Sequence, residues 1–483
     1  MAIISSCFHI VLSPLIFVIQ LLLRIFWSGL NERSIIGLVL NFWINFSPVF
    51  IWLLIFKNAG LIPKKIRPRI FVKFAYRTEN LLFNLIEHPI INALFVFVLT
   101  AGSYLLYSKI YRSIGTINVP SQSSVTYQII AEDEIESPSY ELEPISGSDS
   151  TKSLSLTPSF SSGDTSLELS QFNYDQNIST ETLHGRSEDE EEQVSQFMDL
   201  IYFKHRKYTP NNTKLQLIIN TRKNLQSSNP YRPLNCWYLS SPAILASSWF
   251  LLNLAYAFRE PIKTYKDIIA WFLYVICHFC APLFTAIWLY VFHAPGSLKL
   301  FSIGLGVQNI CGVMTHLLFP NAPPWFIHLY GENKEANYDM PGYAAGLTRV
   351  DVAMGTHLHS KGFHISPIVF GALPSVHSAM AVMVFFFLSY YSRWYSIKII
   401  GLCFVILQWW ATIYLDHHWR LDLIVGMAYS IIVFTILLRW IKRYDERFIK
   451  KRLKGERLGS ETMGMRVFKN TCIEFFFDPL NLK

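Results

Sequence analysis

The stretch SVHSAMAVMVFFFLSYY, residues 375–391, is followed by two further apolar stretches, IKIIGLCFVILQWWATIYL at 397–415 and LDLIVGMAYSIIVFTILLR at 421–439. Each is close to the length of about 20 residues that lets an α-helix cross a bilayer. Only short polar links separate them, so each helix returns the chain to the side from which the previous helix started. The sequence therefore predicts a series of antiparallel transmembrane helices.

The rest of the chain extends this pattern. Apolar side chains make up 51% of the 483 residues, more than one soluble core of this size usually buries. Further apolar runs lie at 6–23, 36–56, 91–108, 239–256, 268–292 and 299–319. We expect an all-α, polytopic membrane protein with N-terminal membrane segments in 1–110 and a six-span core in 236–440. The run at 6–23 has no basic region before it, so we interpret it as a retained segment rather than a cleaved signal peptide.

The net charge of +8 conceals two opposed regions. Residues 132–199 have a balance of −15, which leaves +23 for the remainder. The acidic residues belong to a Ser-rich polar insertion at 111–235, which we predict to be largely disordered because its centre is too poor in apolar side chains to form a core. It is either a regulatory or tethering loop or a dispensable insertion. The basic residues adjoin apolar spans, a pattern that indicates anionic lipid headgroups rather than nucleic acid.

Loop charges also predict an orientation. Basic loops concentrate on the cytosolic side, so we place the basic tail 441–483 and the insertion in the cytosol and the long loop 320–373 on the other side. The segment 57–77 holds seven Lys and Arg residues and by the same rule should be cytosolic. Counting three N-terminal spans puts it on the other side, so we expect that at least one N-terminal segment does not cross the membrane.

Two short strings hold the candidate catalytic residues, GALPSVHS at 371–378 and DHHWRLD at 416–422. His377 and His418 are separated by a helical hairpin, which places both at one face of the bilayer. Asp422 follows His418 by four residues, a spacing that brings the two side chains together on one helical face. The carboxylate can then orient one imidazole nitrogen and leave the other free to attack an electrophile.

A phosphoryl group is the electrophile that we predict. Its transfer needs an in-line nucleophile, a proton donor for the leaving oxygen, and cations or amides around the remaining oxygens. His418 can be the nucleophile and His377 the proton donor. For phosphate binding we predict Arg349, Lys361 and the helix start at Ser375 and Ser378, with Arg420 as a weaker alternative.

The other polar residues in the membrane region receive structural interpretations. The seven cysteines predict no disulfide framework, and Cys277-His278-Phe279-Cys280 is interpreted as packing inside a span. His357, His359 and His364 match no known spacing for zinc ligands, so we predict no metal and no cofactor. His417 is interpreted as a neighbour of the nucleophile because Leu421, one turn later, cannot orient it.

Both strings resemble the type 2 phosphatidic acid phosphatase superfamily. Pro374-Ser375-Val376-His377 is similar to its second motif, and His418-x-x-x-Asp422 is similar to the core of its third. The resemblance implies a phosphohistidine at His418 and general acid catalysis by His377. The Ser-Arg pair of the phosphatase branch is replaced by Ala411 and Thr412, and we find no K-x6-R-P first motif, so a transferase is favoured over a phosphatase.

Three further segments resemble the fungal inositol phosphorylceramide synthase group: Phe319–Trp325, Gly346–Asp351 and 371–378. Outside the core, four segments resemble the inositolphosphotransferase branch of that group: Asn45–Lys57, Gly60–Pro63, Gly464–Phe468 and Phe475–Leu480. This resemblance implies transfer of inositol phosphate from phosphatidylinositol to mannosyl-inositol-phosphorylceramide, with release of diacylglycerol, in the Golgi membrane and with the active site toward the lumen. Ceramide is the alternative acceptor, and a membrane lipid transporter is the alternative of another class.

Overall fold

The computed structural model describes residues 18–30, 34–114, 241–392, 394–454, 456, 459–469, 471 and 473–480. All of these residues lie in one of the two compact units of the chain. The described secondary structure is helical, and extended pairing among these residues is limited to isolated bridges from Asn321 to Phe71 and to Gly371. The predicted all-α class is confirmed. The predictions for the insertion fall almost entirely outside the described residues.

Five helices in the described ranges are long and apolar enough to cross a membrane. They are α2 (Ile35–Asn58) with the short turn after it, the continuous helix of α9 (Thr264–Trp271), η3 (Phe272–Cys277) and α10 (His278–Phe292), α11 (Ser297–Leu318), α16 (Tyr395–Tyr414) and α17 (Arg420–Leu453). Three more apolar helices are α4 (Pro89–Ile114), α8 (Ser241–Ala257) and α15 (Val376–Tyr391). The protein is therefore a multi-pass membrane protein.

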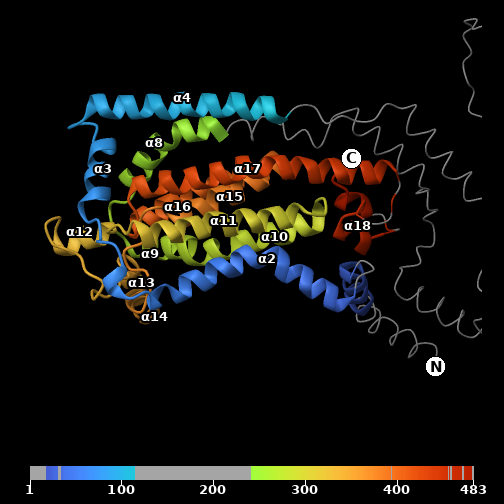
Figure 1. Cartoon of the computed structure of the whole chain (residues 1–483), viewed down its shortest axis with the longest axis horizontal. Coiled ribbons are helices and arrows are strands. Elements are labelled where there is room, and N and C mark those ends of the chain that lie inside the picture. Colours follow the sequence, from blue (N-terminus) through green and yellow to red (C-terminus); the bar gives the residue numbers. More distant parts are fainter. Residues whose placement is uncertain are drawn as a thin grey trace, which may run out of the picture. The chain divides into compact units, whose positions relative to one another are not determined.

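Every one of the six predicted core spans corresponds to a helix. The helices run side by side along the long axis of the bundle (Figure 1). The shortest of them, α15, lies among α10, α11, α16 and α17, and its Phe385 and Phe387 are fully buried. Helix α17 continues to Leu453, so the expected boundary at residue 440 falls inside one helix.

Helix α2 follows α11 closely along the bundle and bends near its centre (Figure 1). Pro48 lies at this position, and proline removes the amide that would bond to the carbonyl of Ile44. The hydroxyl of Ser47 donates to that carbonyl at 2.8 Å, which replaces the lost hydrogen bond inside an apolar environment. Gly306 of α11 makes room for the bend, because a Cβ there would lie 2.3 Å from Pro48 Cβ.

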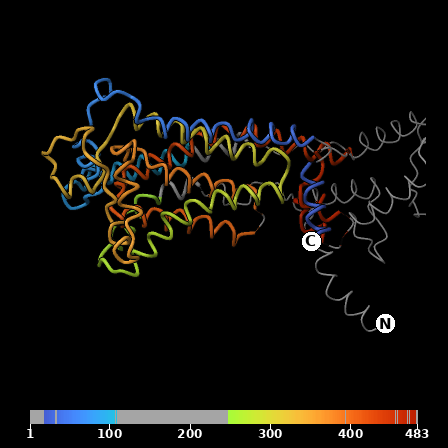
Figure 2. Tube along the Cα trace, turned by 90° about the horizontal axis from the view of Figure 1, so that it is seen from below, coloured from blue at the N-terminus to red at the C-terminus, as the bar shows by residue number. Residues whose placement is uncertain are grey.

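Short elements cover the two ends of the bundle. At one end lie α3 (Lys73–Phe83), α12 (Pro324–Tyr330), α13 (Leu347–Met354) and α14 (Leu358–His364), and at the other lie the helix Val18–Leu30 and α18 (Met463–Val467) (Figures 1 and 2). The helix Val18–Leu30 joins α18 through a hydrogen bond from Arg466 Nε to the Ser28 carbonyl, 3.1 Å long. Most of the run at 6–23 lies outside the described residues.

The basic segment 57–77 lies at the end that holds the long loop 320–373. Phe71 N donates to the Pro320 carbonyl at 2.9 Å, and Lys73 Nζ donates to Asn333 Oδ1 at 2.8 Å. Our expectation that this segment shares a side with the C-terminal tail is therefore wrong. The physical reason is that its cations have partners in the long loop, and these contacts fix its place more strongly than the general preference for basic cytosolic loops.

The C-terminal residues fold back onto the bundle. Buried Arg452, near the end of α17, forms an ion pair with Asp478. Gly464 lies so close to Phe477 that a Cβ there would be 2.2 Å from the ring. The described residues after Leu453 thus form a packed cap on this end of the bundle.

Candidate active site

A tight turn between α16 and α17 carries His418. Asp416 has φ = 63°, in the left-handed region, and the amide of His417 bonds back to the Thr412 carbonyl at 3.1 Å. At the start of α17, Asp422 Oδ2 accepts the amide hydrogen of Trp419 at 2.9 Å. The same carboxylate thus caps the helix and fixes the residue next to His418.

The start of α15 is held directly against this turn. The amide of Ser375 donates to the Asp422 carbonyl at 3.0 Å. Gly426, one turn further along α17, permits this approach, because a Cβ there would lie 2.2 Å from the Ser375 carbonyl oxygen. The sequence strings 371–378 and 416–422 therefore meet at one end of the bundle, as predicted.

His418 is oriented by two acceptors. Its Nδ1 lies 3.1 Å from the Ala372 carbonyl oxygen and 3.5 Å from Asp422 Oδ2. A carbonyl oxygen can only accept, so Nδ1 carries the proton and Nε2 has a free lone pair. Asp422, with no exposed surface, can stabilise positive charge that develops on the ring. The predicted contact between His418 and Asp422 is confirmed, and the arrangement suits a nucleophilic Nε2.

His377 faces His418 across the site, with 5.8 Å between the ring centroids. The prediction that both imidazoles share one end of the bundle is confirmed. His377 Nδ1 is buried, and no hydrogen bond reaches it among the described residues. Its position next to His418, without a hydrogen-bond partner at Nδ1 in the described part of the chain, is compatible with a group that gives and takes a proton.

His377 belongs to a column of five rings. Tyr274 stacks on it at a centroid distance of 4.2 Å, and His278 contacts it at 4.2 Å. Tyr274 also stacks on His417 at 5.0 Å, and Phe363 stacks on His417 at 4.9 Å. The column joins α10, the segment before it, the catalytic turn and α14, so it fixes the plane of the His377 ring.

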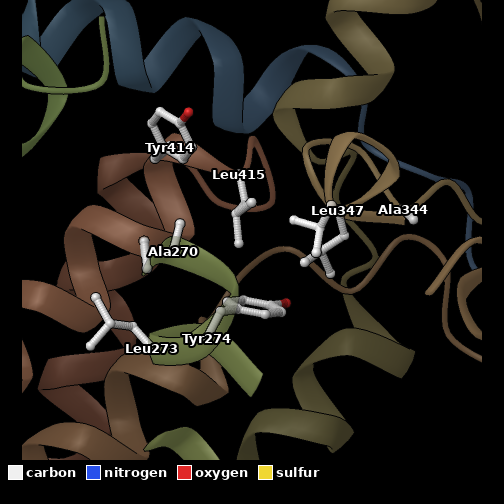
Figure 3. Close-up of a cluster of buried hydrophobic side chains, with 9 residues drawn as sticks. Ala270, Leu273, Tyr274, Ala344, Leu347, Tyr414 and Leu415 are labelled. Atoms are coloured by element: carbon white, nitrogen blue, oxygen red, sulfur yellow. The ribbon is translucent and has the colours of Figure 1, made fainter. Parts of the chain in front are cut away.

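A change of helical winding presents Tyr274 to the column. Residues Phe272–Cys277 form a π-helix, a local widening that is often found at functional sites. Figure 3 shows Leu273 and Tyr274 on this stretch and Ala270 at the end of α9 just before it, with Tyr274 pointing toward Leu347 of α13. These residues belong to one buried apolar cluster, which anchors the π-helix against the long loop.

Burial also sets the charge of His417, which lies between two spans. Burial removes the ring from water and is the main reason why the pKa of His417 is lowered to about 3. The nearby His418 lowers the pKa further in the same direction. The ring is therefore neutral at physiological pH and acts in the column as an aromatic plate. This agrees with its interpretation as a neighbour of the nucleophile.

The predicted phosphate-binding cations occupy different environments. Arg349 Nε donates to Asp267 Oδ1 at 2.8 Å, and its guanidinium lies over the Tyr414 ring at 5.4 Å. Its Nη2 is buried and has no partner in the described part of the chain. Lys361 is exposed on α14, and no described hydrogen bond or ion pair involves its side chain. Arg349 is thus held with one free donor edge, whereas Lys361 lies in solvent.

The two serines are fully buried and hydrogen-bonded within the protein. Ser375 Oγ accepts from the Ser378 amide at 3.3 Å and so caps α15. Ser378 Oγ donates to the Leu423 carbonyl at 2.7 Å and accepts from Trp409 Nε1 at 2.8 Å. The Ser378 hydroxyl thus holds α15 against α16 and α17. Phosphate binding by the serines, and by Arg349 and Lys361, stays a prediction.

Other predicted or weighed residues have structural partners. His359 bonds to Asp351 at 2.7 Å and to Trp271 at 3.0 Å, and His316 bonds to the Pro374 carbonyl at 2.8 Å. Arg420, the weaker phosphate candidate, pairs with Glu79. Over the described ranges, no group of three or more His, Cys, Asp or Glu side chains could hold a metal ion.

Sequence reasoning missed Tyr274 and His278. The C-x-x-C spacing around His278 directed attention to the cysteines, and Cys277 and Cys280 are free thiols. A usable signal was present, because an imidazole inside a span is costly and usually has a functional or structural partner. Nothing in the apolar pattern of that span, however, identified His377 as the partner.

The geometry brings two histidines and a carboxylate together at one end of the helical bundle, and comparison with known proteins finds a family match over this part of the chain. Residues 249–436, which contain His377, His418 and Asp422, match the PAP2 superfamily. This match confirms the resemblance of the two motifs. No solved structure matches the chain significantly.

Among curated proteins, the chain is similar to inositolphosphotransferase 1 of Saccharomyces cerevisiae. The identity is 29% across 94% of this chain and 97% of the relative. The inositol phosphorylceramide synthase of Candida albicans is 39% identical across 35% of each chain. The corresponding catalytic subunit of Schizosaccharomyces pombe is 36% identical across 38% of this chain and 43% of its own. The two kinds of relative are those that the sequence motifs indicated.

Proposed function

We propose that this protein is a sphingolipid inositolphosphotransferase that moves inositol phosphate from phosphatidylinositol to mannosyl-inositol-phosphorylceramide and releases diacylglycerol. The observation that carries the proposal is the orientation of His418. Its Nδ1 faces the Ala372 carbonyl and Asp422, which leaves Nε2 as a nucleophile beside His377. The relative that is similar over nearly the whole chain is named an inositolphosphotransferase, which supports this reaction class.

The first half of the reaction forms a phosphohistidine. His418 Nε2 attacks the phosphorus of phosphatidylinositol, and the bond between phosphorus and the diacylglycerol oxygen breaks as the N–P bond forms. His377, initially protonated, gives its proton to the departing oxygen. Asp422 stabilises the positive charge of the substituted imidazole. Diacylglycerol leaves into the bilayer, and inositol phosphate stays on His418.

The second half reverses these roles. His377, now neutral, takes the proton from a hydroxyl of the acceptor sugar, and the resulting oxygen attacks phosphorus. The N–P bond breaks and its electron pair returns to His418 Nε2. His377 is again protonated, so one cycle restores both histidines and consumes no other reactant.

The test is to trap the intermediate. Purified protein is incubated with phosphatidylinositol labelled in the phosphate, without acceptor, and the acid-labile label is mapped by mass spectrometry. We expect one labelled residue, His418, and no label in His418→Ala protein of equal abundance. Label on another residue, or full transfer activity in His418→Ala, would exclude the proposed mechanism. Absence of both label and transfer in the wild-type protein would leave the transporter alternative.

Ceramide is the second candidate acceptor, because the inositol phosphorylceramide synthases match at 36–39% identity, more than the 29% of the full-length relative. Their matches, however, cover little more than a third of this chain. Labelled phosphatidylinositol supplied with either ceramide or the mannosylated lipid discriminates the two reactions. Product from ceramide alone would exclude the mannosylated acceptor.

The proposal also includes a location. We place the enzyme in the Golgi membrane, with the catalytic end in the lumen and the C-terminal cap in the cytosol. Single cysteines at exposed Lys361 and exposed Lys450, each labelled from one side of sealed Golgi vesicles, check this orientation. Labelling of both from the same side would contradict it.

A further inference from the structure

A cavity of about 420 Å³ lies beside the catalytic segments, and none of His377, His418 and Asp422 lines it. Its walls come from four segments that are distant in sequence, one of which is the end of α11 at His316 and Leu317 with Pro320. Of the other three, the first carries Lys64 and Arg67, the second carries Tyr338 and Asp339, and the third runs from His364 to Phe370. Its volume falls in the range of small-molecule sites, and a single polyol headgroup is smaller than this space.

The cavity is connected to the active site through shared backbone. His316 lines the cavity and also bonds to the carbonyl of Pro374, at 2.8 Å. The segment 364–370 continues directly into 371–378, whose Ala372 carbonyl orients His418. A ligand in the cavity would therefore contact the chain a few residues before the catalytic histidine His377.

The charged groups of the cavity lie at its outer part. Lys64 pairs with Asp339, and their side chains are 59% and 75% exposed. Arg67 is held by the carbonyls of Ala59 and Ile62, at 2.9 and 3.0 Å, and its guanidinium lies 5.1 Å from the centre of the Tyr338 ring. Two cations face one carboxylate, so the cavity has an excess of positive charge.

This combination suits an anionic, hydroxyl-rich ligand. Lys and Arg side chains bind phosphate oxygens through charge-assisted hydrogen bonds. The carboxylate of Asp339 and the hydroxyl of Ser366 can bond to ligand hydroxyl groups. An apolar ligand would remove water from these charged and polar groups without offering them hydrogen bonds, which is unfavourable.

The cationic wall is specific to the N-terminal part of the chain. Lys64 and Arg67 lie outside 249–436, the residues that match the PAP2 superfamily. A match across 38% of the chain is too short to include both Lys64 and Asp422, whereas the match across 94% is long enough. The match to the synthases therefore cannot include both the cationic residues of the cavity and the catalytic motifs, whereas the match to the inositolphosphotransferase is long enough to include both.

We propose that this cavity binds an inositol phosphodiester headgroup, with Lys64 and Arg67 facing the phosphate. The inference rests on the proposed function and gives the protein a headgroup-binding site in addition to the site at the histidines. Both the donor phosphatidylinositol and the mannosylated acceptor carry this chemistry, whereas ceramide carries none of it. The lipid whose KM changes when the cavity residues are substituted is the lipid whose headgroup binds there.

Two substitutions with opposite expected effects test the cavity. Lys64→Gln removes a cation, and Asp339→Asn removes the carboxylate that neutralises it. KM is measured in mixed micelles for each lipid in turn, with the other lipid saturating. We expect Lys64→Gln to raise the KM of one lipid about two- to fivefold and Asp339→Asn to lower it, which is the range of exposed charge pairs. Lys65→Gln is the control, since Lys65 is exposed and does not line the cavity.

Each outcome has a definite meaning. Opposite KM shifts for phosphatidylinositol place the donor in the cavity, and opposite shifts for the mannosylated lipid place the acceptor there. Unchanged KM values, shifts of the same sign, or a fall in kcat alone would overturn the inference. Failure of the proposed function is recognised separately, because the wild-type protein would then transfer no inositol phosphate to either acceptor.

Discussion

Glu79 of α3 and Arg420 of α17 form a buried ion pair, with Arg420 Nε 2.6 Å from Glu79 Oε1, although 341 residues separate them. Glu79 Oε2 also accepts the amide hydrogen of Leu421 at 3.1 Å. Burial raises the pKa of Glu79, and the adjacent Arg420 opposes this effect. One N-terminal carboxylate therefore fixes the residues between His418 and Asp422.

We expect Glu79→Leu to destabilise the protein and to lower transfer activity. Removing one partner of a buried pair leaves an uncompensated charge, at a cost of about 3–5 kcal/mol. The combined change Glu79→Leu with Arg420→Met should recover part of this loss, since no buried charge is left. Thermal unfolding in detergent measures the effect, and exposed Glu87→Leu is the control. A double variant less stable than Glu79→Leu would contradict a stabilising ion pair.

Asp422→Asn should lower kcat by a factor of about 10³–10⁴, as loss of an orienting carboxylate does in comparable sites. An asparagine can still accept the Trp419 amide hydrogen, so the turn and the thermal stability should change little. What is lost is the negative charge beside His418 Nδ1. Activity near that of the wild type would show that the Ala372 carbonyl alone orients the nucleophile.

The ring column should matter through the position of His377. We expect Tyr274→Leu to lower kcat about three- to tenfold, which corresponds to the loss of an aromatic pair, and Tyr274→Phe to retain activity because a phenyl ring still stacks. Since Tyr274→Leu frees the His377 ring, the pH profile of kcat should also shift. Tyr290→Leu, on an exposed side of α10, is the matched control. Equal losses in Tyr274→Phe and Tyr274→Leu would point to the hydroxyl instead of stacking.

The parts of the fold that sequence could predict follow from local rules. The apolar runs identified all six core helices, and the spacing of His418 and Asp422 placed both on one helical face. A hairpin of known length then placed His377 at the same end. These arguments use only distances along the chain, so they do not depend on which helices pack together.

The remaining features depend on contacts between distant segments. A span that is apolar on all sides does not reveal which face packs against its neighbours. Its pattern therefore could not predict that Tyr274 and His278 contact His377. The preference of basic loops for the cytosolic side gave the wrong place for segment 57–77. This preference takes no account of tertiary contacts, and Phe71 and Lys73 have partners in the long loop. Helix α17 continues beyond its apolar stretch to Leu453, since the charged residues after 439 are good helix formers.

The close contact between α15 and α17 predicts the effect of a single methyl group. Gly426→Ala would place Cβ 2.2 Å from the Ser375 carbonyl oxygen, so the two helices must separate. Overpacking of this kind costs about 1–3 kcal/mol, and the displacement moves His377 away from His418. We therefore expect a lower unfolding temperature and a loss of kcat larger than the stability change explains. Gly102→Ala in α4 is the control, because a Cβ there has no atom within 4 Å. If both variants retained wild-type activity, the backbone contact would not be what holds the two histidines in reach of one phosphate.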